Sequence, residues 1–207
     1  METIKRYSPL IFDSQPVRTE WRDGWEVVLA YKDEGKGPYL ADLSHIAKWD
    51  IQDAHLSKIQ PTGIAIPQTP GACIFNNGAL INRLNLTQAS VWHVFGLNAE
   101  IPEGFAYTDT TDAFAMLALL GADNFSIMEK VTALNLQPRE IQSPFLIQGP
   151  VLHVSCQVVI LGKDVLILAF SRGYAHSMSE ALLEVGSEWN LKPAGELVFK
   201  NSVGSYA

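Results

Sequence analysis

The sequence predicts an α/β (α+β) protein whose two halves repeat one unit, a strand followed by a short helix and a hairpin of strands. Chain-breaking residues recur at corresponding points of the two halves. The run from Phe114 to Leu120 is almost unbroken in its apolar character, as in a strand buried on both faces. With 47% hydrophobic and 18% charged residues over 207 positions, the composition is globular, which argues against disorder. We expect residues 1–110 to form the first half and residues 111–207 the second.

The first half opens with an extended lead-in over residues 1–20. Trp25 to Tyr31 has the composition of a strand, and a turn rich in Gly and Lys ends it before Pro38. An apolar stretch follows over residues 39–51, and Asp53 introduces a short helix over residues 54–59. The remaining predicted elements are strands over 72–81 and 84–94, with a bend at 76–78, and a polar connection over 96–109 that carries Glu100 and Glu103.

The second half repeats this order. Gly121 ends the apolar strand, and Asp123 caps a helix whose apolar stripe includes Ile127 and Met128. A link rich in Pro leads to a hairpin over 151–161 and 165–170. An amphipathic helix over 174–189 follows, because its apolar residues recur at spacings of three and four. Lys192 to Gly195 ends this helix and leaves a short tail.

Aligning residues 47–54 with residues 116–123 brings the two units into register. Side-chain identities between them are weak, so the duplication depends on the order of the elements and on the positions of the breakers.

Charge and apolar runs exclude several classes of protein. A net charge of −7 argues against a nucleic-acid groove, which needs clustered Lys and Arg. The longest uncharged apolar run, residues 151–162, is too short to span a bilayer, and the N-terminus has no signal-peptide core, so we expect a cytoplasmic protein. In that compartment Cys73 and Cys156 are expected to be free, buried thiols, with a disulfide between them as the alternative.

No catalytic or metal-binding motif stands out from the residues alone. The five histidines and two cysteines lack metal-ligand spacing, so we expect no metal site. The nucleophile elbow, the phosphate loop and the dinucleotide fingerprint are missing from the sequence. Ser44 and His45 are neighbours on a predicted strand, so their side chains point to opposite faces and cannot form a nucleophile–base pair directly.

Several segments nevertheless match one family in order. Residues 23–31 form a Gly-Trp strand ending in Tyr, and Asp42-Leu43-Ser44-His45-Ile46-Ala47-Lys48 follows. They resemble the opening of the glycine-cleavage T protein (aminomethyltransferase) family, with its Asp-(Val/Leu)-Ser-His-Met-Gly-Lys signature. Residues 71–81 resemble its Asn-Glu-x-Gly-Gly-Ile-Ile strand, residues 119–122 its Leu-Gln-Gly-Pro, and residues 180–195 its last helix and Lys-Pro-(Ala)-Gly turn. The resemblance covers about residues 20–195.

The resemblance implies two related α/β halves packed with a C-terminal barrel around a tetrahydrofolate channel. This chain extends only a little beyond Gly195, so we expect the fold without that barrel. The gamma subunit of heterotetrameric sarcosine oxidase is a similar short relative that works inside a complex. The resemblance therefore implies tetrahydrofolate as the cofactor to consider and a protein partner or homo-oligomer.

The departures from the family pattern concern its chemically important positions. Asn82 and Arg83 stand where active members carry Asp-Asp, and Lys163 stands where a pterin-binding glutamate belongs. An unpaired pterin amino group would cost about 1–3 kcal/mol per contact. The two cations could line the former cofactor cleft, with Asn82, and favour an anion such as a polyglutamate tail or a partner carboxylate. The alternative is that both lie on solvated hairpin ends.

These departures lead us to expect a non-catalytic, folate-binding-type accessory subunit of a one-carbon or methylamine/sarcosine-oxidising complex. Apolar residues around the end of the last helix would then be exposed for a partner: Trp189, Leu191, Leu197, Val198 and Phe199. The alternative is a tetrahydrofolate-dependent aminomethyl or methyl transferase with rearranged catalytic residues, for which Asp42, Ser44 and His45 are the candidates. The structural reading of Asp42 and Ser44 is that they satisfy backbone groups at a bend. A homo-oligomer without a ligand is the third reading.

Overall fold

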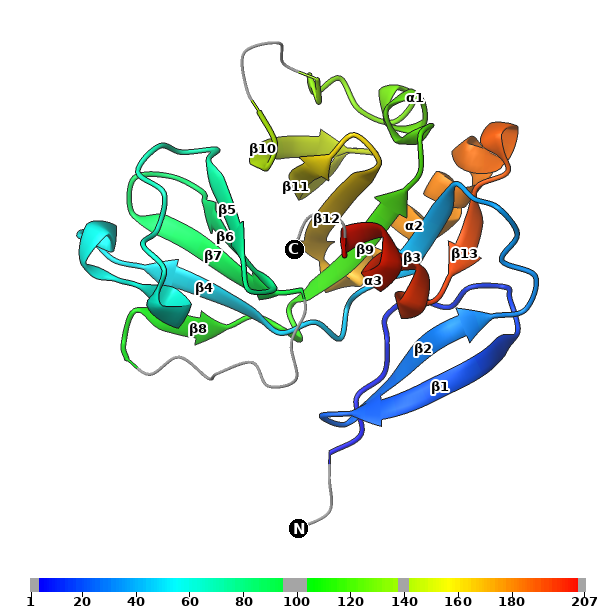
Figure 1. The fold of residues 1–207 in the computed structure, drawn as a ribbon, viewed down its shortest axis with the longest axis horizontal. Helices are drawn as coiled ribbons and strands as arrows, with labels where there is room; N and C mark the ends of the chain where they lie inside the picture. Colours follow the sequence, from blue (N-terminus) through cyan, green and yellow to red (C-terminus); the bar gives the residue numbers. More distant parts are fainter. Residues whose placement is uncertain (1–3, 95–103, 138–141, 205–207) are drawn as a thin grey trace.

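The computed structural model describes residues 4–94, 104–137 and 142–204. Their strands form a two-stranded hairpin, a five-stranded sheet and a six-stranded sheet, with three short α-helices (Figure 1). Sheets with few helices confirm the α+β class predicted from the sequence.

The hairpin consists of β1 (Pro16–Arg22) and β2 (Trp25–Tyr31), which are antiparallel. Asp23 and Gly24 both have positive φ, as a two-residue hairpin turn requires. Buried side chains on one face of β2 pack together with Leu197: Trp25, Val27 and Leu29. The β1–β2 register is irregular on both sides of Arg18.

The five-stranded sheet is antiparallel throughout, in the order β5 (Cys73–Asn76), β6 (Ala79–Arg83), β7 (Gln88–His93), β4 (Lys48–Gln52), β8 (Tyr107–Asp109). Alternate residues of β4, β6 and β7 form an apolar core on one face, including Trp49, Ile51, Ile81 and Val91. Because side chains alternate along a strand, the residues between them, Lys48, Asp50, Asn82 and Ser90 among them, share the opposite face.

The six-stranded sheet has the order β10 (Phe145–Val151), β11 (Val154–Gly162), β12 (Val165–Ser171), β9 (Phe114–Leu120), β3 (Tyr39–Asp42), β13 (Lys192–Ala194). Its β3–β13 pair is parallel and the others are antiparallel. One face packs against α1 (Asn124–Glu129) and α2 (Ala175–Gly186), and the other packs against α3 (Glu196–Val203). The prediction that Phe114 to Leu120 is buried on both faces is confirmed.

The two sheets confirm the duplication. In one, β4 is followed along the chain by β5, β6 and β7, and β7 pairs back with β4. In the other, β9 is followed by β10, β11 and β12, and β12 pairs back with β9. The strands that precede these units are exchanged, because β3 comes before β4 but pairs with β9, while β8 comes before β9 but pairs with β4. The predicted boundary at residue 110 falls between β8 and β9. It stays a prediction, because each half contributes one strand to the sheet of the other half.

The predicted alignment of the repeat is wrong by one residue. Trp49 lies opposite Asp109, and Leu117 lies opposite Asp42, so Lys48 corresponds to Met116. We aligned Ala47 with Met116. A slip of one residue reverses the face of every side chain, and weak identities could not exclude it.

Several helix and strand predictions need correction. The helix predicted over 54–59 is a single 3₁₀ turn, Leu56–Lys58, because Pro61 leaves too few residues for an α-helix. The α-helix predicted over 174–189 runs only from Ala175 to Gly186, between 3₁₀ turns. The stretch over 39–51 splits into β3 and β4, and the strand over 84–94 shortens to β7. The polar connection over 96–109 lies partly outside the described residues, with Glu100 and Glu103, and ends in β8.

Four further elements were not predicted: β1, β10, β13 and α3. The strand β10 contains Gly149 and Pro150, which suggested a link, but β10 is an edge strand, where Pro is tolerated. The residues after Gly195 form α3 rather than a simple tail.

The prediction of an exposed apolar surface near the last helix is wrong. Phe199 is fully buried and Leu191 is 6% exposed. Trp189, Leu197 and Val198 are partly buried and pack against the three neighbouring cores. Trp189 and Leu191 pack in the core on the α1 and α2 side of the six-stranded sheet. The other three belong to α3, which packs against the hairpin and the opposite face of that sheet, so the chain itself covers all five side chains. Among the described helices, none is long and apolar enough to cross a membrane.

Candidate functional site

Two chain segments cross between the sheets: residues 43–47 connect β3 to β4, and residues 110–113 connect β8 to β9. The two crossing segments make equivalent hydrogen bonds. Asp42 accepts a hydrogen bond from the Ser44 amide through Oδ1, at 2.8 Å. The Ser44 hydroxyl then accepts a bond from the amide of Met116, at 3.2 Å. This is an Asx turn whose serine satisfies a buried amide of the other half.

The second segment repeats this arrangement. Asp109 accepts a bond from the Thr111 amide, at 2.8 Å, and the Thr111 hydroxyl accepts one from the Lys48 amide, at 3.0 Å. The Asp-x-Ser and Asp-x-Thr triplets therefore perform the same structural role on the two sides of the crossing. For Asp42 and Ser44, this is the structural role expected as the alternative to a catalytic one.

The three candidate catalytic residues lie together. Asp42 is the last residue of β3, and Ser44 and His45 lie in the turn that follows rather than on a strand as predicted. Ser44 is completely buried, and its hydroxyl is engaged by Met116. Asp42 also accepts a hydrogen bond from the Ser8 hydroxyl. His45 Nε2 lies 3.0 Å from Oε1 of Glu196. Each of the three therefore has an internal partner.

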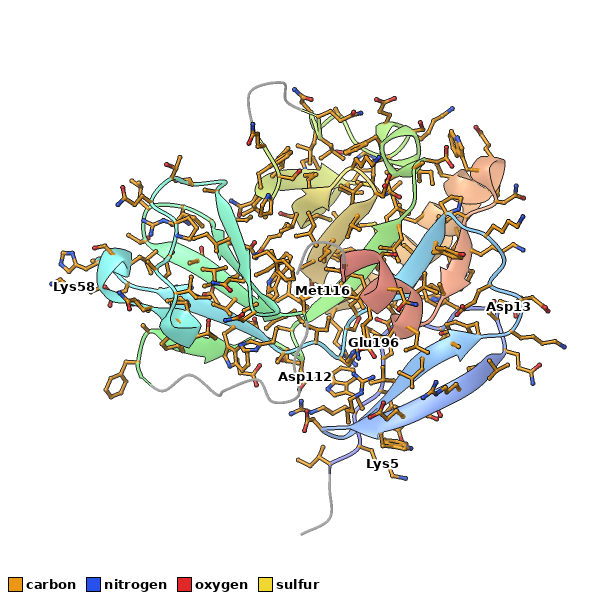
Figure 2. The ribbon with its side chains drawn as sticks, in the orientation of Figure 1. Lys5, Asp13, Lys58, Asp112, Met116 and Glu196 are labelled. Atoms are coloured by element: carbon orange, nitrogen blue, oxygen red, sulfur yellow. The ribbon has the colours of Figure 1, made fainter. Side chains whose placement is uncertain are left out.

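Glu196, at the start of α3, is the centre of a buried charge cluster between this helix and the hairpin (Figure 2). Its side chain is 3% exposed and accepts two hydrogen bonds from Arg22. It also forms an ion pair with Lys200, whose Nζ lies 2.9 Å from Oε2 of Glu196. Burial alone would raise the pKa of Glu196, but hydrogen bonds from Arg22, His45 and Lys200 outweigh it and hold this pKa well below its usual range. Sequence patterns do not predict this cluster, because Glu196 falls in the stretch expected to be a tail.

A cavity of about 50 Å³ adjoins Asp42 and His45. Tyr31 also lines it, and burial, together with the Asp42 and Glu34 carboxylates, raises the pKa of this tyrosine. A volume of this size suits one or a few water molecules rather than a cofactor.

Asn82, which the resemblance aligns with a family carboxylate, connects the two sheets. It is fully buried on β6 and donates a hydrogen bond to the Ser90 hydroxyl, at 3.2 Å. Ser90 in turn donates to Oε1 of Gln157 on β11, at 3.3 Å. Among the described residues, Oδ1 of Asn82 has no partner.

The structure does not bring Arg83 and Lys163 to the same place. Arg83 is 8% exposed and donates to the carbonyl oxygen of Leu86 within its own hairpin turn, at 2.6 Å. Lys163 is exposed in the turn between β11 and β12. It follows Gln157 by six residues, or roughly 20 Å along a strand. Lys163 therefore lies at a solvated hairpin end, whereas Arg83 is buried, and a ligand for either stays a prediction.

A polar cavity of about 130 Å³ lies between the sheets. Its lining includes Lys48, Asp50, Gln88, Ser90 and Gln157. The Lys48 side chain is 2% exposed, and burial lowers its pKa to about 7. Its Nζ donates to the carbonyl oxygens of two residues in the preceding turn, at 2.9 and 2.7 Å. The sequence does not single out this lysine, because a lysine in a strand usually faces solvent.

These residues do not fit tetrahydrofolate. Typical cofactor sites measure about 300–1,000 Å³, which exceeds the cavity volume. The carboxylate in the lining, Asp50, already accepts hydrogen bonds from Gln52 at 2.6 Å and Gln88 at 2.8 Å, one on each oxygen. Within the described ranges, no group of three or more His, Cys, Asp or Glu side chains could hold a metal ion. Both cysteines are free and buried, as predicted.

Comparison with known proteins gives matches only at the level of structure. No family model matches the sequence, and no curated protein matches it. A chain of heterotetrameric sarcosine oxidase from Corynebacterium sp. U-96, in complex with pyrrole 2-carboxylate, matches with a TM-score of 0.63 and 15% identity. This match covers 75% of the present chain and 88% of the other.

Glycine cleavage system aminomethyltransferase T from Bartonella henselae matches with a TM-score of 0.59 and 14% identity, over 88% of the present chain and 57% of the other. The present chain thus spans little more than half of that protein. At these identities the similarity concerns the fold, and this chain has the aminomethyltransferase-type fold shared by the two proteins, as its sequence motifs predicted.

Proposed function

We propose that this chain is a non-catalytic accessory subunit of an enzyme complex that oxidises sarcosine or another methylated amine, or otherwise acts on one-carbon units. The observation that carries the proposal is the state of the polar residues at the family's motif positions. Asp42, Ser44 and His45 hold internal contacts, and the neutral amide of Asn82 stands where a proton-accepting carboxylate is needed.

The similar chain from a heterotetrameric oxidase supports a role within a complex. The match extends over 88% of that chain, so the present protein corresponds to most of one subunit. In this chain the polar motif residues make internal contacts that stabilise the fold. Such an arrangement suits a subunit that assembles with other chains better than one that transfers a group.

The proposal is tested by co-expressing the chain with the products of its neighbouring genes. We expect a stoichiometric complex that oxidises a methylated amine and fails to assemble without this chain. Within that complex, His45→Gln should leave the turnover number unchanged. The proposal is wrong if the chain forms no complex with these products, or if His45→Gln abolishes turnover in a complex that still assembles.

The alternative, a tetrahydrofolate-dependent aminomethyl or methyl transferase, is favoured by one observation, the position of Asp42 and His45 beside one small cavity. Isothermal titration with tetrahydrofolate and a folylpolyglutamate, on wild type and Arg83→Ala, separates the two readings. We expect no heat from either protein, since the polar cavity does not fit the pterin. Heat with the wild type that Arg83→Ala removes would instead support an anion site at Arg83.

A further inference from the structure

The outermost strand of the hairpin, β1, has one free edge. Within the described part of the chain, β1 pairs with β2 alone. All its residues except Arg22 are exposed, and Figure 1 shows β1 at the margin of the molecule. A free strand edge presents unpaired backbone N–H and C=O groups, so it is a template for another strand.

Exposed apolar side chains gather at this end of the chain. Eight large hydrophobic side chains are exposed among the described residues, and five of them lie within residues 4–21. On β1 these are Val17, 60% exposed, and Trp21, 52% exposed. Such a concentration of apolar side chains favours contact with another protein surface.

The sequence of β1 is complementary to itself. When two copies pair antiparallel about a two-fold axis, the axis passes through a residue that faces its own copy. With Thr19 at the axis, Arg18 lies opposite the partner's Glu20, and Val17 lies opposite the partner's Trp21. Opposite charges and pairs of an aromatic with a β-branched residue are favourable across strands, and each of these contacts occurs twice in the dimer.

The neighbouring registers lack this complementarity. An axis at Arg18 would place that residue against its own copy, and an axis at Glu20 would do the same with two carboxylates. Like charges directly opposite one another destabilise a strand pair. Pro16 has no N–H to donate, so the ladder ends at that residue. Charge thus disfavours both neighbouring registers and favours the one with Thr19 at the axis.

We propose that β1 pairs antiparallel with β1 of a second copy of this chain about Thr19, joining two hairpins into one four-stranded sheet. The occupant of the free edge is a second copy because the charge pattern matches the strand's own sequence. This inference does not depend on the proposed function, since a subunit of a larger complex and an independent protein can both dimerise through this edge.

Sedimentation velocity from roughly 1 to 200 µM tests the proposal, with a concentration-dependent dimer expected for the wild type. Arg18→Glu places a carboxylate against the partner's Glu20, and Glu20→Arg places a cation against the partner's Arg18. Each change converts two attractive contacts into repulsive ones and should raise the dimer dissociation constant at least about tenfold. The double variant Arg18→Glu/Glu20→Arg restores opposite charges and should return the constant to within about threefold of wild type.

Lys58→Glu is the matched control, because it makes the same type of charge change at an exposed residue at the opposite end of the molecule (Figure 2). Circular dichroism establishes that each variant is folded. A wild type that stays monomeric over the whole range overturns the proposal. So does a dimer that both single variants leave intact, or a double variant that dimerises no better than they do.

Discussion

The charge cluster around Glu196 gives a prediction that can be worked from the structure. Glu196→Gln keeps the shape of the side chain but removes the charge that holds Arg22 and Lys200. Loss of a buried partner typically costs about 3–5 kcal/mol. Arg22 and Lys200 are 29% and 37% exposed, so water solvates the freed cations and lowers this cost to about 3 kcal/mol.

Urea and thermal unfolding measure this effect. For a chain of this size, about 3 kcal/mol corresponds to a fall in Tm of roughly 6–12 °C. The matched control is Glu180→Gln, which removes an exposed carboxylate that is 3.4 Å from His176 on the surface of α2. We expect the control to change stability by less than about 0.5 kcal/mol. The reasoning fails if Glu196→Gln is no more destabilising than Glu180→Gln.

The effect should also depend on pH. The pKa of Glu196 is lower in the folded protein than the ordinary value of about 4.3 in the unfolded chain. Its contribution is therefore fully present above that ordinary value and is lost as the pH falls toward the folded pKa. The stability difference between wild type and Glu196→Gln should shrink when unfolding is measured at successively lower pH below about 4.3. A difference that stays constant in this range contradicts the assignment.

Four further substitutions test these assignments. Ser44→Ala and Thr111→Val each leave a buried amide without its acceptor, so each should lower the free energy of unfolding in urea by about 1–3 kcal/mol. If either substitution costs nothing, the two crossing segments are not equivalent. The pKa of Lys48 is lowered to about 7 in the folded protein, so the unfolded chain binds more protons between pH 7 and about 10. Over this range wild type should gain stability relative to Lys48→Met, and a stability difference that does not change with pH refutes this. Gly195→Ala places a Cβ 2.2 Å from the Leu29 backbone, so thermal unfolding should show a loss above about 2 kcal/mol, and a neutral result would contradict the packing of α3 on the hairpin.

Local patterns predicted the elements whose signals lie within one stretch of chain. The apolar run from Phe114 to Leu120 identified β9, and the helical spacing of Met178 and Leu182 identified α2. The order of breakers revealed the duplication, although it could not set the register to the residue.

Pairing between distant segments could not be predicted in the same way. The exchange of β3 and β8 depends on contacts between residues roughly 55 to 80 positions apart, which leave no periodicity in either segment. The residue type of Lys48 does not reveal whether its side chain is buried or faces solvent. Glu196 lies beside Gly195, which was interpreted as the end of the last helix.

The candidate site was predicted in part. The motif led to Asp42, Ser44 and His45, which the structure does place together, at the end of β3 and in the turn that follows. Their chemistry depends on partners such as Met116 and Glu196, which only the folded chain supplies.

The most direct test of the central claim is the consumption of a methylated amine by the purified chain with tetrahydrofolate, in the absence of any other protein. The proposed function predicts a rate equal to that of buffer, because Asp42 and Ser44 hold internal contacts and Asn82, which the resemblance aligns with a carboxylate, is a neutral amide. Saturable consumption that Asp42→Asn abolishes in a folded protein would contradict it.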